Sequence, residues 1–266
     1  MLRETMSVKG MPAMSARSNQ TPDGRAEDIP RAPEQWRALC AARLGARGWL
    51  SQQPERFRQQ MLDMVVAVHV PRGTPVFSVN GPPGGIYGII SGGIGIEGSG
   101  PYNVPRLGHI LRAGSWFGHG PVLTGRGHRV QNMRALEDSE LAYAPLAPLR
   151  ALLQSDNEAA RCISSIADGG NILGTRIISD LLIPTVPHRI AAVLLRVTGI
   201  EDGIEPDHPE GFRITQTELG EMANVSRALV NRVLGDFARA GWITKHYNRL
   251  RVDDLASLQA FAASQV

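Results

Sequence analysis

Three side chains near residue 230 have the chemistry and spacing needed to contact DNA bases. They are Arg227, Asn231 and Arg232. Arginine can donate two hydrogen bonds to guanine O6 and N7, and asparagine can pair with adenine. All three fall in the first half of a predicted helix, 227–240, and the second helix of a helix-turn-helix contacts bases through its N-terminal part. The pattern therefore predicts a helix that lies in a major groove.

Capping residues mark the two helices of this predicted unit. Thr215 and Glu218 have the spacing of a capping box, so a first helix is predicted over 216–223. Ser226 supplies the N-cap of the second helix, and Gly241 follows its end, where a left-handed residue is favoured. Apolar residues at three- and four-residue spacing predict the buried face: Leu219, Met222, Ala223, Val225, Leu229, Val233, Leu234 and Phe237.

The segment after this helix pair, 242–252, is predicted to be a basic β-hairpin, or wing, that turns at Tyr247-Asn248. Between 211 and 252 there are seven Lys or Arg against three Asp or Glu, the sign that phosphate contacts need. A three-helix core with a solvated charged face is the alternative, but the caps, the turn and the hairpin together favour DNA binding. The predicted DNA-binding residues are Thr215, Gln216, Ser226, Arg227, Ala228, Asn231, Arg232, Lys245 and Arg249.

Length and composition limit the number of domains and the kinds of site that the chain can form. The chain has 266 residues, 42% of them hydrophobic, which is enough for two domains with cores. Its two cysteines, Cys40 and Cys162, exclude a disulfide framework, a zinc cluster or a four-cysteine iron–sulfur site within one chain. The sequence shows no apolar run long enough to span a membrane and no signal peptide at its N-terminus. We therefore expect a cytoplasmic protein with no membrane partner and no metal site.

The first predicted domain is an antiparallel roll. Residues 1–33 have little to bury and are predicted to be a disordered tail, and a later methionine than Met1 is an alternative start. Within 34–152, short amphipathic helices lead into short apolar runs broken by Gly and Pro, which predict strands of a β-roll. Gly93-x-Gly95-x-x-Gly98 spells a dinucleotide fingerprint, but no helix can follow it at Ser99-Gly-Pro101. We assign these glycines to turns and close strand packing.

A long helix is predicted over 153–184, followed by a second domain over 185–266. Pro184 and Pro187 mark the boundary, because residues before proline leave the helical region. Two interpretations of the helix stay open: the seam of a two-stranded coiled coil, and a single helix packed on its own domain. The residues at the heptad-like spacing are Ala159, Ile163, Ile166, Gly170, Leu173, Ile177 and Leu181.

The order of roll, long helix, proline-marked hinge and winged helix-turn-helix resembles the cyclic-AMP receptor protein/FNR (Crp/Fnr) family of bacterial transcription regulators, over about 57–252. The resemblance implies an α+β fold, with an N-terminal antiparallel β-roll of the cyclic-nucleotide-binding jelly-roll type, a dimerisation helix and a C-terminal winged helix-turn-helix. It also implies a homodimer through the 159–181 helix, a near-palindromic double-stranded DNA site, and RNA polymerase as a partner. The most specific matching pieces are Ile90-Ser-Gly-Gly93, Leu111-x-x-Gly114-x-x-Phe117-Gly118, Arg189-Ile-Ala191 and Ser226-Arg227-x-x-Val230-x-Arg232.

Position 228 departs from the best-known relative. Ala228 stands where the cyclic-AMP receptor protein has a glutamate, whereas Arg227 and Arg232 match the family's base- and phosphate-contacting arginines. The resemblance therefore implies a different operator sequence.

Segment 117–130 resembles the family's phosphate-binding cassette, with Arg129 where an arginine meets the cyclic phosphate. His119 replaces a glutamate that would accept from the ribose, and Val130 replaces a Ser or Thr that would donate to the phosphate. Each ligand group buried without a partner costs about 1 to 3 kcal/mol. A cyclic nucleotide is thus one candidate effector, at an altered or lost site. The residues implied for that site are Gly118, His119, Gly120, Arg129, Val130 and Thr175.

Three other classes of function are alternatives to a DNA-binding regulator. Metal or haem sensing would draw on His109, His119 and His128, which lack a fixed spacing. A second class is an anion- or nucleotide-binding sensor module that acts mainly through protein contacts, with a structural helix-turn-helix. An enzyme is not expected, because the sequence contains neither HExxH nor GxxxxGK[ST] and no recognisable nucleophile–base pair.

Overall fold

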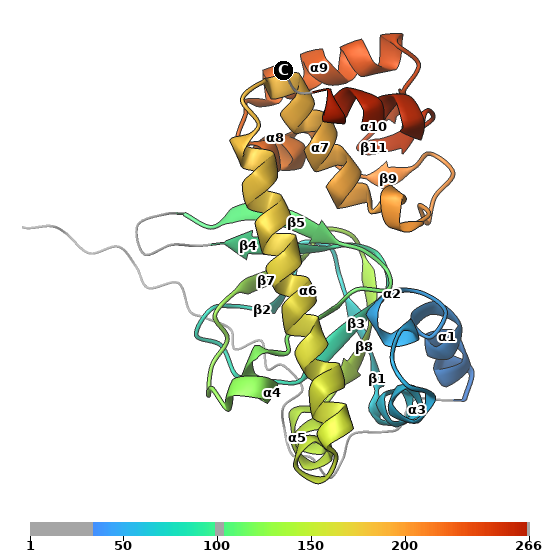
Figure 1. The fold of residues 1–266 in the computed structure, drawn as a ribbon, viewed down its shortest axis with the longest axis vertical. Coiled ribbons are helices and arrows are strands. Elements are labelled where there is room, and N and C mark those ends of the chain that lie inside the picture. Colours follow the sequence, from blue (N-terminus) through green and yellow to red (C-terminus); the bar gives the residue numbers. More distant parts are fainter. Residues whose placement is uncertain (1–33, 99–103, 265–266) are drawn as a thin grey trace, which may run out of the picture.

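The computed structural model describes residues 34–98 and 104–264. The tail predicted to be disordered, 1–33, lies outside the described residues. A β-roll forms one body of the molecule, a helical C-terminal domain forms the other, and one long helix runs along the roll and joins them (Figure 1). Along the described residues, no helix is long and apolar enough to cross a membrane.

The roll consists of two four-stranded antiparallel sheets with the strand orders β1-β8-β3-β6 and β2-β7-β4-β5. Apolar side chains from both sheets fill its interior, among them Ile94 and Leu141, which are fully buried. A short helix, α4 (Gly120–Thr124), interrupts the strands after β6. The strands are β1 (Val66–Val70), β2 (Pro75–Phe77), β3 (Ile86–Ser91), β4 (Ile94–Gly98), β5 (Arg106–Leu111), β6 (Trp116–Phe117), β7 (Asn132–Ala135) and β8 (Ser139–Ala144).

The glycines of this region allow close backbone packing, as the sequence predicts. A Cβ at Gly85 would lie 1.8 Å from the carbonyl oxygen of Ala144 on the neighbouring strand. Gly95 and Gly98 belong to β4, which pairs antiparallel with β5 and β7, so these two glycines of the motif lie in a strand. The dinucleotide fingerprint therefore has no structural counterpart at this position.

Three N-terminal helices, α1 (Glu34–Leu44), α2 (Gly48–Ser51) and α3 (Glu55–Met64), pack against the β3 and β6 side of the roll. Trp49 of α2 makes edge contacts with both Phe57 of α3 and Trp116 of β6. Its indole Nε1 also donates to Ser165 Oγ of the long helix at 2.7 Å. The N-terminal helices thus connect the roll to the helix that runs along it.

The long helix α6 (Asn157–Leu182) follows α5 (Leu146–Ser155) and begins at Asp156, whose carboxylate accepts from the amides of Glu158 and Ala159. The predicted coiled-coil seam is wrong in its first half. Ala159, Ile163 and Ile166 are buried in the core that α6 shares with its own domain. The spacing of apolar residues shows that this face of α6 is buried but not what buries it. In the structure, α3 and α5 of the same domain cover it.

In the second half of α6, the predicted position Leu181 is exposed, and the other exposed large apolar side chains lie outside the predicted seam. Ile172 and Ile178 are 57% and 60% exposed, and Leu182 is 76% exposed. Gly169 and Gly170 have open space where a Cβ would stand. We call Ile172, Ile178, Leu181 and Leu182 the exposed stripe of α6.

The C-terminal domain is a winged helix-turn-helix, so the predicted α+β fold is confirmed. Pro187 lies in the first turn of α7, where its missing N–H is tolerated, so it begins that helix and does not end α6. The small sheet has the order β10-β11-β9. The elements are α7 (Val186–Thr198), the 3-10 helix η1 (Ile200–Asp202), β9 (Phe212–Arg213), α8 (Gln216–Ala223), α9 (Arg227–Arg239), β10 (Ile243–His246), β11 (Arg249–Val252) and α10 (Leu255–Ala263).

The two domains are in direct contact through β5 and the strand ends next to it. Leu107 and Ile110 of β5 belong to the same apolar core as α7, α8 and α9. Arg112, just after β5, is buried and donates to the carbonyl oxygens of Val197 at 3.2 Å and Arg213 at 2.9 Å. Its Nη1 pairs with Glu137 at 2.7 Å. This arginine therefore ties the roll to the C-terminal domain.

Candidate nucleic-acid interface and effector pocket

The helix pair begins with the predicted capping box. Thr215 Oγ1 accepts from the Glu218 amide at 3.1 Å, and Glu218 Oε2 accepts from the Thr215 amide at 2.8 Å. Glu218 also pairs with Arg213 of β9 at 2.8 Å. Burial alone would raise the pKa of the Glu218 carboxyl, but the Thr215 amide and the Arg213 guanidinium outweigh it, and the pKa is lowered. The carboxylate thus stays ionised and fixes the start of α8.

The turn between the helices fixes the start of α9. Asn224 ends α8 in the left-handed conformation with a φ of 52°, which asparagine tolerates better than most residues. A Cβ at Gly220 would lie 2.8 Å from the Val225 carbonyl oxygen, so the helices can approach only with glycine there. Ser226 Oγ accepts from the Leu229 amide at 3.3 Å, as the N-cap prediction requires.

This geometry places the predicted base-contacting residues together on one face. Val230, Val233, Leu234 and Phe237 bury the opposite face of α9 in the domain core. The exposed face shows Arg227, Ala228, Asn231 and Arg232 in the first two turns of α9. Figure 1 shows α9 at the end of the molecule remote from the roll, where a duplex can approach it.

Gln216, at the start of α8, contacts this face of α9 through its side-chain amide. Its Nε2 donates to Asn231 Oδ1 at 3.0 Å. Its Oε1 lies 3.5 Å from Arg227 Nε, at the outer limit of a hydrogen bond. Thr215, by contrast, uses its hydroxyl for the capping box and is half-buried.

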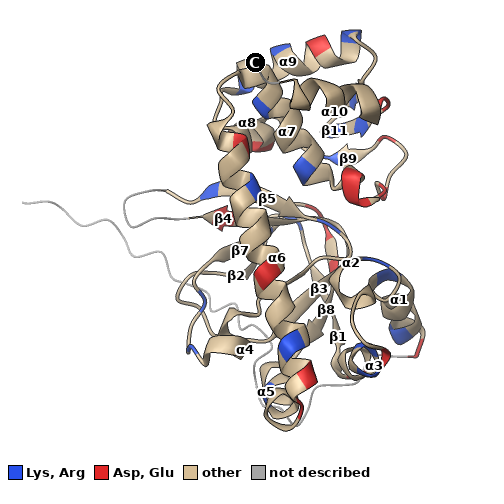
Figure 2. Ribbon diagram, viewed as in Figure 1, with Lys and Arg blue, Asp and Glu red and all other residues tan. Residues whose placement is uncertain are grey.

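The wing has the predicted shape but offers less charge than the sequence count implies. Lys245 is exposed on β10, and Tyr247 at the turn is 91% exposed. Arg249 donates to the Gly211 carbonyl oxygen at 3.0 Å. Other arginines of the region form ion pairs with acids of their own domain: Arg213 with Glu218, Arg239 with Asp236, and Arg251 with Asp253. Figure 2 shows red acidic segments next to blue ones on α9. Arg227, Arg232 and Lys245 are thus cations of this region that are exposed and for which the structure describes no ion pair.

The segment that resembles a phosphate-binding cassette surrounds the arginine predicted to meet an anion. Arg129 is 2% exposed, and its Nη1 and Nη2 donate to the carbonyl oxygens of Gly118 at 2.6 Å and Gly85 at 2.9 Å. The guanidinium lies over the Phe77 ring, 4.1 Å from its centroid. Gly118 has a φ of 91°, a conformation that favours glycine. These two hydrogen bonds and the Phe77 ring hold the guanidinium in place beside Gly118.

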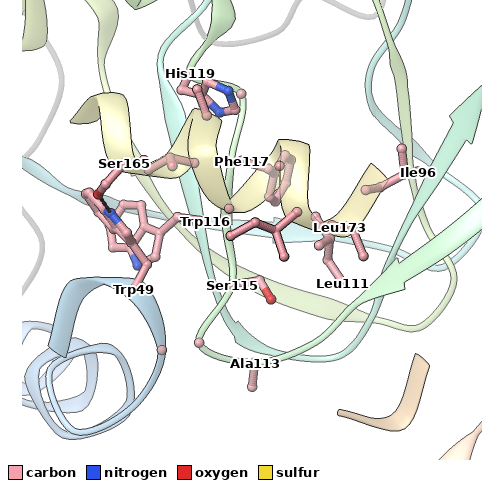
Figure 3. Close-up of a pocket in the computed structure, with 18 of the residues that line it drawn as sticks. Trp49, Ile96, Leu111, Ala113, Ser115, Trp116, Phe117, His119, Ser165 and Leu173 are labelled. Carbon is pink, nitrogen blue, oxygen red and sulfur yellow. Dashed lines mark hydrogen bonds between the residues drawn. The ribbon is translucent and has the colours of Figure 1, made fainter. Parts of the chain in front are cut away.

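A cleft of about 1540 Å³ lies beside the cassette, between the roll, α6 and the N-terminal helices. Much of its lining is apolar or aromatic, including Trp49, Phe117 and Leu173 (Figure 3). Ile204 and Glu205 of the C-terminal domain also line it, so the cleft reaches the domain contact.

The structure brings most of the predicted effector residues together at this cleft. Gly118, His119, Gly120, Arg129 and Val130 line it, and Val130 is 54% exposed. Burial, and then Arg129, lower the pKa of the His119 imidazole, so this side chain is neutral at pH 7. Thr175 is not among the lining residues. It is exposed, and its hydroxyl donates to the Asn171 carbonyl oxygen at 3.0 Å.

The three histidines weighed as metal or haem ligands lie in different surroundings. His109 is buried at the domain contact, where its Nδ1 is 2.9 Å from Arg196 Nη1. His119 begins α4, and His128 is exposed. Within 34–98 and 104–264, no three His, Cys, Asp or Glu side chains gather as metal ligands would. Burial raises the pKa of the Cys40 thiol to about 12, so it stays protonated.

Two buried arginines at the domain contact are not among the residues predicted from the sequence. Arg112 and Arg196 are buried arginines at the domain contact, and Arg196 pairs with Asp180 of α6 at 2.6 Å. Arg112 stands within the mainly apolar segment 107–117, and this position is the one feature of the sequence that suggests a buried arginine. Its partners at Val197 and Arg213 are too distant in sequence to be inferred.

Comparisons with known proteins match both parts of the chain. Residues 188–261 match the Crp-like helix-turn-helix domain and residues 67–156 the cyclic nucleotide-binding domain. The chain is 26% identical, over 70% of its length and 84% of the relative's, to the CRP-like cAMP-activated global transcriptional regulator of Mycobacterium tuberculosis. It is 29% identical, over 50% of its length and 64% of the relative's, to the cAMP-activated global transcriptional regulator Vfr of Pseudomonas aeruginosa.

A solved structure supports the same fold. FixK2 from Bradyrhizobium japonicum superposes with a TM-score of 0.64 over 76% of this chain and 99% of that one, at 14% identity. The two matched domains, in the order of roll, long helix and winged helix-turn-helix, show that the chain belongs to the Crp/Fnr family of transcription regulators.

Proposed function

We propose that this protein is a homodimeric, sequence-specific DNA-binding transcription regulator whose effector site has lost or altered its cyclic-nucleotide chemistry. The observation that carries the proposal is the exposed cluster of Arg227, Asn231 and Arg232 at the start of a capped helix. Side chains at that place on a helix-turn-helix contact base edges. The proposed partners are double-stranded DNA with a near-palindromic site, a second copy of the chain, and RNA polymerase. The proposed setting is the cytoplasm, and no enzymatic activity is proposed.

The exposed stripe of α6 supports the homodimer. The large apolar side chains of this stripe are exposed to solvent when the chain is alone. Gly169 and Gly170 lie beside it, and their lack of a side chain leaves room for a second helix to approach closely. A two-fold pair of such helices would repeat α9 about one DNA turn away, which fits a near-palindromic site. Thr175 lies among these exposed positions, so a second copy would cover it.

The altered effector site is supported by the state of its polar residues. The terminal nitrogens of Arg129 already donate to two carbonyl oxygens, and His119 is a neutral ring where the resemblance implies a carboxylate. Val130 has no hydroxyl to offer a phosphate.

Selection of DNA from a random library tests the DNA-binding function. The wild-type protein is expected to recover one near-palindromic sequence, and Arg227→Ala with Arg232→Ala to abolish it. Arg161→Ala, at an exposed arginine of α6 far from α9, is the control and should recover the wild-type sequence. Binding that is salt-sensitive but blind to sequence would instead favour the sensor module that acts through protein contacts.

Calorimetry with cyclic AMP and cyclic GMP tests the effector site. We expect no binding heat from the wild type, because the ribose and phosphate groups would be buried without partners. The double variant His119→Glu, Val130→Ser restores the residue types that the resemblance implies and should bind more tightly than the wild type. Tight cyclic-nucleotide binding by the wild type would contradict the altered site.

A further inference from the structure

The amide of Gln216 holds the amide of Asn231 in one orientation. Arg227 Nε lies 3.5 Å from Gln216 Oε1, and Gln216 Nε2 lies 3.0 Å from Asn231 Oδ1. A guanidinium has five donors and no acceptor, so the Gln216 atom that faces Arg227 must be the oxygen. The Gln216 nitrogen then faces Asn231 and donates, so Asn231 must present its oxygen there. The chemistry of Arg227 therefore determines the direction of both amides.

Among the described residues 227–232 of α9, Asn231 carries the only side-chain acceptor, and this orientation engages it. Ser226, just before the helix, already accepts from the Leu229 amide at 3.3 Å. Asn231 Oδ1 is occupied by Gln216, and its Nδ2 is left to point elsewhere. The other exposed side chains of the first two turns are Arg227 and Arg232, which only donate, and Ala228, which does neither. The nearest acid on the helix, Asp236, is paired with Arg239.

We infer that α9 presents hydrogen-bond donors only and therefore selects base edges that only accept, with Gln216 as the positioning residue. This inference rests on the proposed DNA-binding function. Guanine shows two acceptors in the major groove and thymine one, whereas adenine and cytosine each show an amino donor. Guanine is expected at the pair that Arg227 contacts, and guanine or thymine at the pair that Asn231 contacts. Asparagine with its oxygen free would prefer adenine.

The spacing of Arg227 and Asn231 along α9 limits how far apart the two contacted base pairs can be. Arg227 and Asn231 are one helical turn apart, roughly 6 Å along α9. Base pairs are stacked at about 3.4 Å. The two contacted pairs are therefore neighbours or next neighbours, and the Ala228 methyl lies between them, where a thymine methyl can pack against it.

The test is DNA selection with the full-length protein and its variants, followed by affinity measurement on the recovered site. Asn231→Ala identifies the pair that Asn231 contacts as the position at which base preference disappears. In the wild type that pair should be guanine or thymine on the strand that α9 faces, and adenine there should weaken binding roughly tenfold.

Gln216→Glu gives the decisive result. A carboxylate accepts from Arg227 but cannot donate, so Asn231 must turn its Nδ2 toward position 216 and its oxygen toward the groove. The preferred base at the Asn231 pair should change to adenine or cytosine, while the preference at the Arg227 pair stays. Thr217→Glu adds the same charge one residue away on exposed surface and should weaken binding without changing either preference.

The outcomes separate the inference from the function on which it rests. No enriched palindrome from the wild type would overturn both. A palindrome with adenine or cytosine at the Asn231 pair, or an unchanged preference in Gln216→Glu, would overturn the donor-only face and leave sequence-specific binding intact. Circular dichroism of each variant confirms that the helix pair is folded.

Discussion

At the scale of single residues, Glu218 links the start of the DNA-contacting unit to its core. It accepts from the Thr215 amide and from Arg213, whose own carbonyl oxygen accepts from the interdomain Arg112. One carboxylate thus closes a cap, neutralises a buried arginine and stands next to the domain contact. Such a group stabilises the fold only while it is ionised.

The first prediction concerns acid stability. Because the folded pKa of Glu218 lies below its ordinary value of 4.5, its stabilising effect is complete above that value. The effect is lost as the pH falls through the lower folded pKa. Glu218→Gln should lower the free energy of unfolding at pH 7 by about 1 to 2 kcal/mol.

Urea unfolding between pH 7 and pH 3 measures this effect. The difference in stability between the wild type and Glu218→Gln should shrink as the pH falls through the acid range. Glu34→Gln, at an exposed position of α1, is the control and should follow the wild type at every pH. A difference that stays constant down to pH 3 would show that the pKa of Glu218 is the same in the folded and the unfolded protein.

At the scale of elements, the wing and α6 have different tasks in the proposed complex. The wing carries Lys245 on an exposed strand position without any described ion pair, whereas Arg251 in the neighbouring strand pairs with Asp253 at 2.6 Å. Phosphate contacts release counterions and add to the salt dependence of binding. Lys245 and Arg251 are therefore a matched pair for a test.

The second prediction follows from that difference. Lys245→Ala should weaken binding to all DNA sequences alike and reduce the slope of log affinity against log salt by about 1. Arg251→Ala should change the slope less, because Asp253 already neutralises its charge. Fluorescence anisotropy over a salt series measures both slopes, and equal slopes for the two variants would contradict this assignment.

The third prediction concerns the exposed stripe of α6. Ile178→Glu places a charge where a second copy would bury it, so the variant should be monomeric and should lose affinity for the full palindrome. Ala151→Glu adds the same charge at an exposed position of α5 and should stay dimeric. Analytical ultracentrifugation gives the oligomeric state, and a dimeric Ile178→Glu variant would place the interface elsewhere.

At the scale of the whole molecule, Arg112 lies between the cleft beside the cassette and the C-terminal domain. The residues on either side of it, Leu111 and Ala113, line the cleft. Its guanidinium bonds Val197 and Arg213 of the other domain and lies 5.6 Å from the Phe212 ring centroid. Arg112 thus joins the strand end beside the cleft to α7 and to β9, which precedes the helix-turn-helix.

The fourth prediction tests this connection. Arg112→Met should lower the stability by about 3 kcal/mol or more, because it leaves Glu137 and two carbonyl groups without their buried partner. Arg134→Met breaks the more exposed pair with Glu97 and should cost less than about 1 kcal/mol.

Hydrogen exchange adds a local readout to these two variants. In Arg112→Met, protection should fall first at β9 and at the end of α7, where its partners lie. Equal losses of stability in Arg112→Met and Arg134→Met would show that the domain contact does not depend on this arginine.

The sequence by itself determined the elements that depend on neighbours within a few residues. The capping box at Thr215, the N-cap at Ser226 and the left-handed Gly241 define the helix pair, because a cap is satisfied by amides two or three residues away. Alternating apolar runs between turn residues likewise defined the roll. The resemblance then supplied the order of the domains and their family.

Only the tertiary structure decided which partner each polar or apolar side chain takes. The seam residues Ala159, Ile163 and Ile166 turned inward because other helices of the same domain cover them. Arg129 bonds Gly85, and Arg112 bonds Val197, which lies 85 residues away in the chain. Such contacts form between segments that only folding brings together. A side chain's charge is set by its residue type, but whether a ligand can use that charge depends on these distant neighbours.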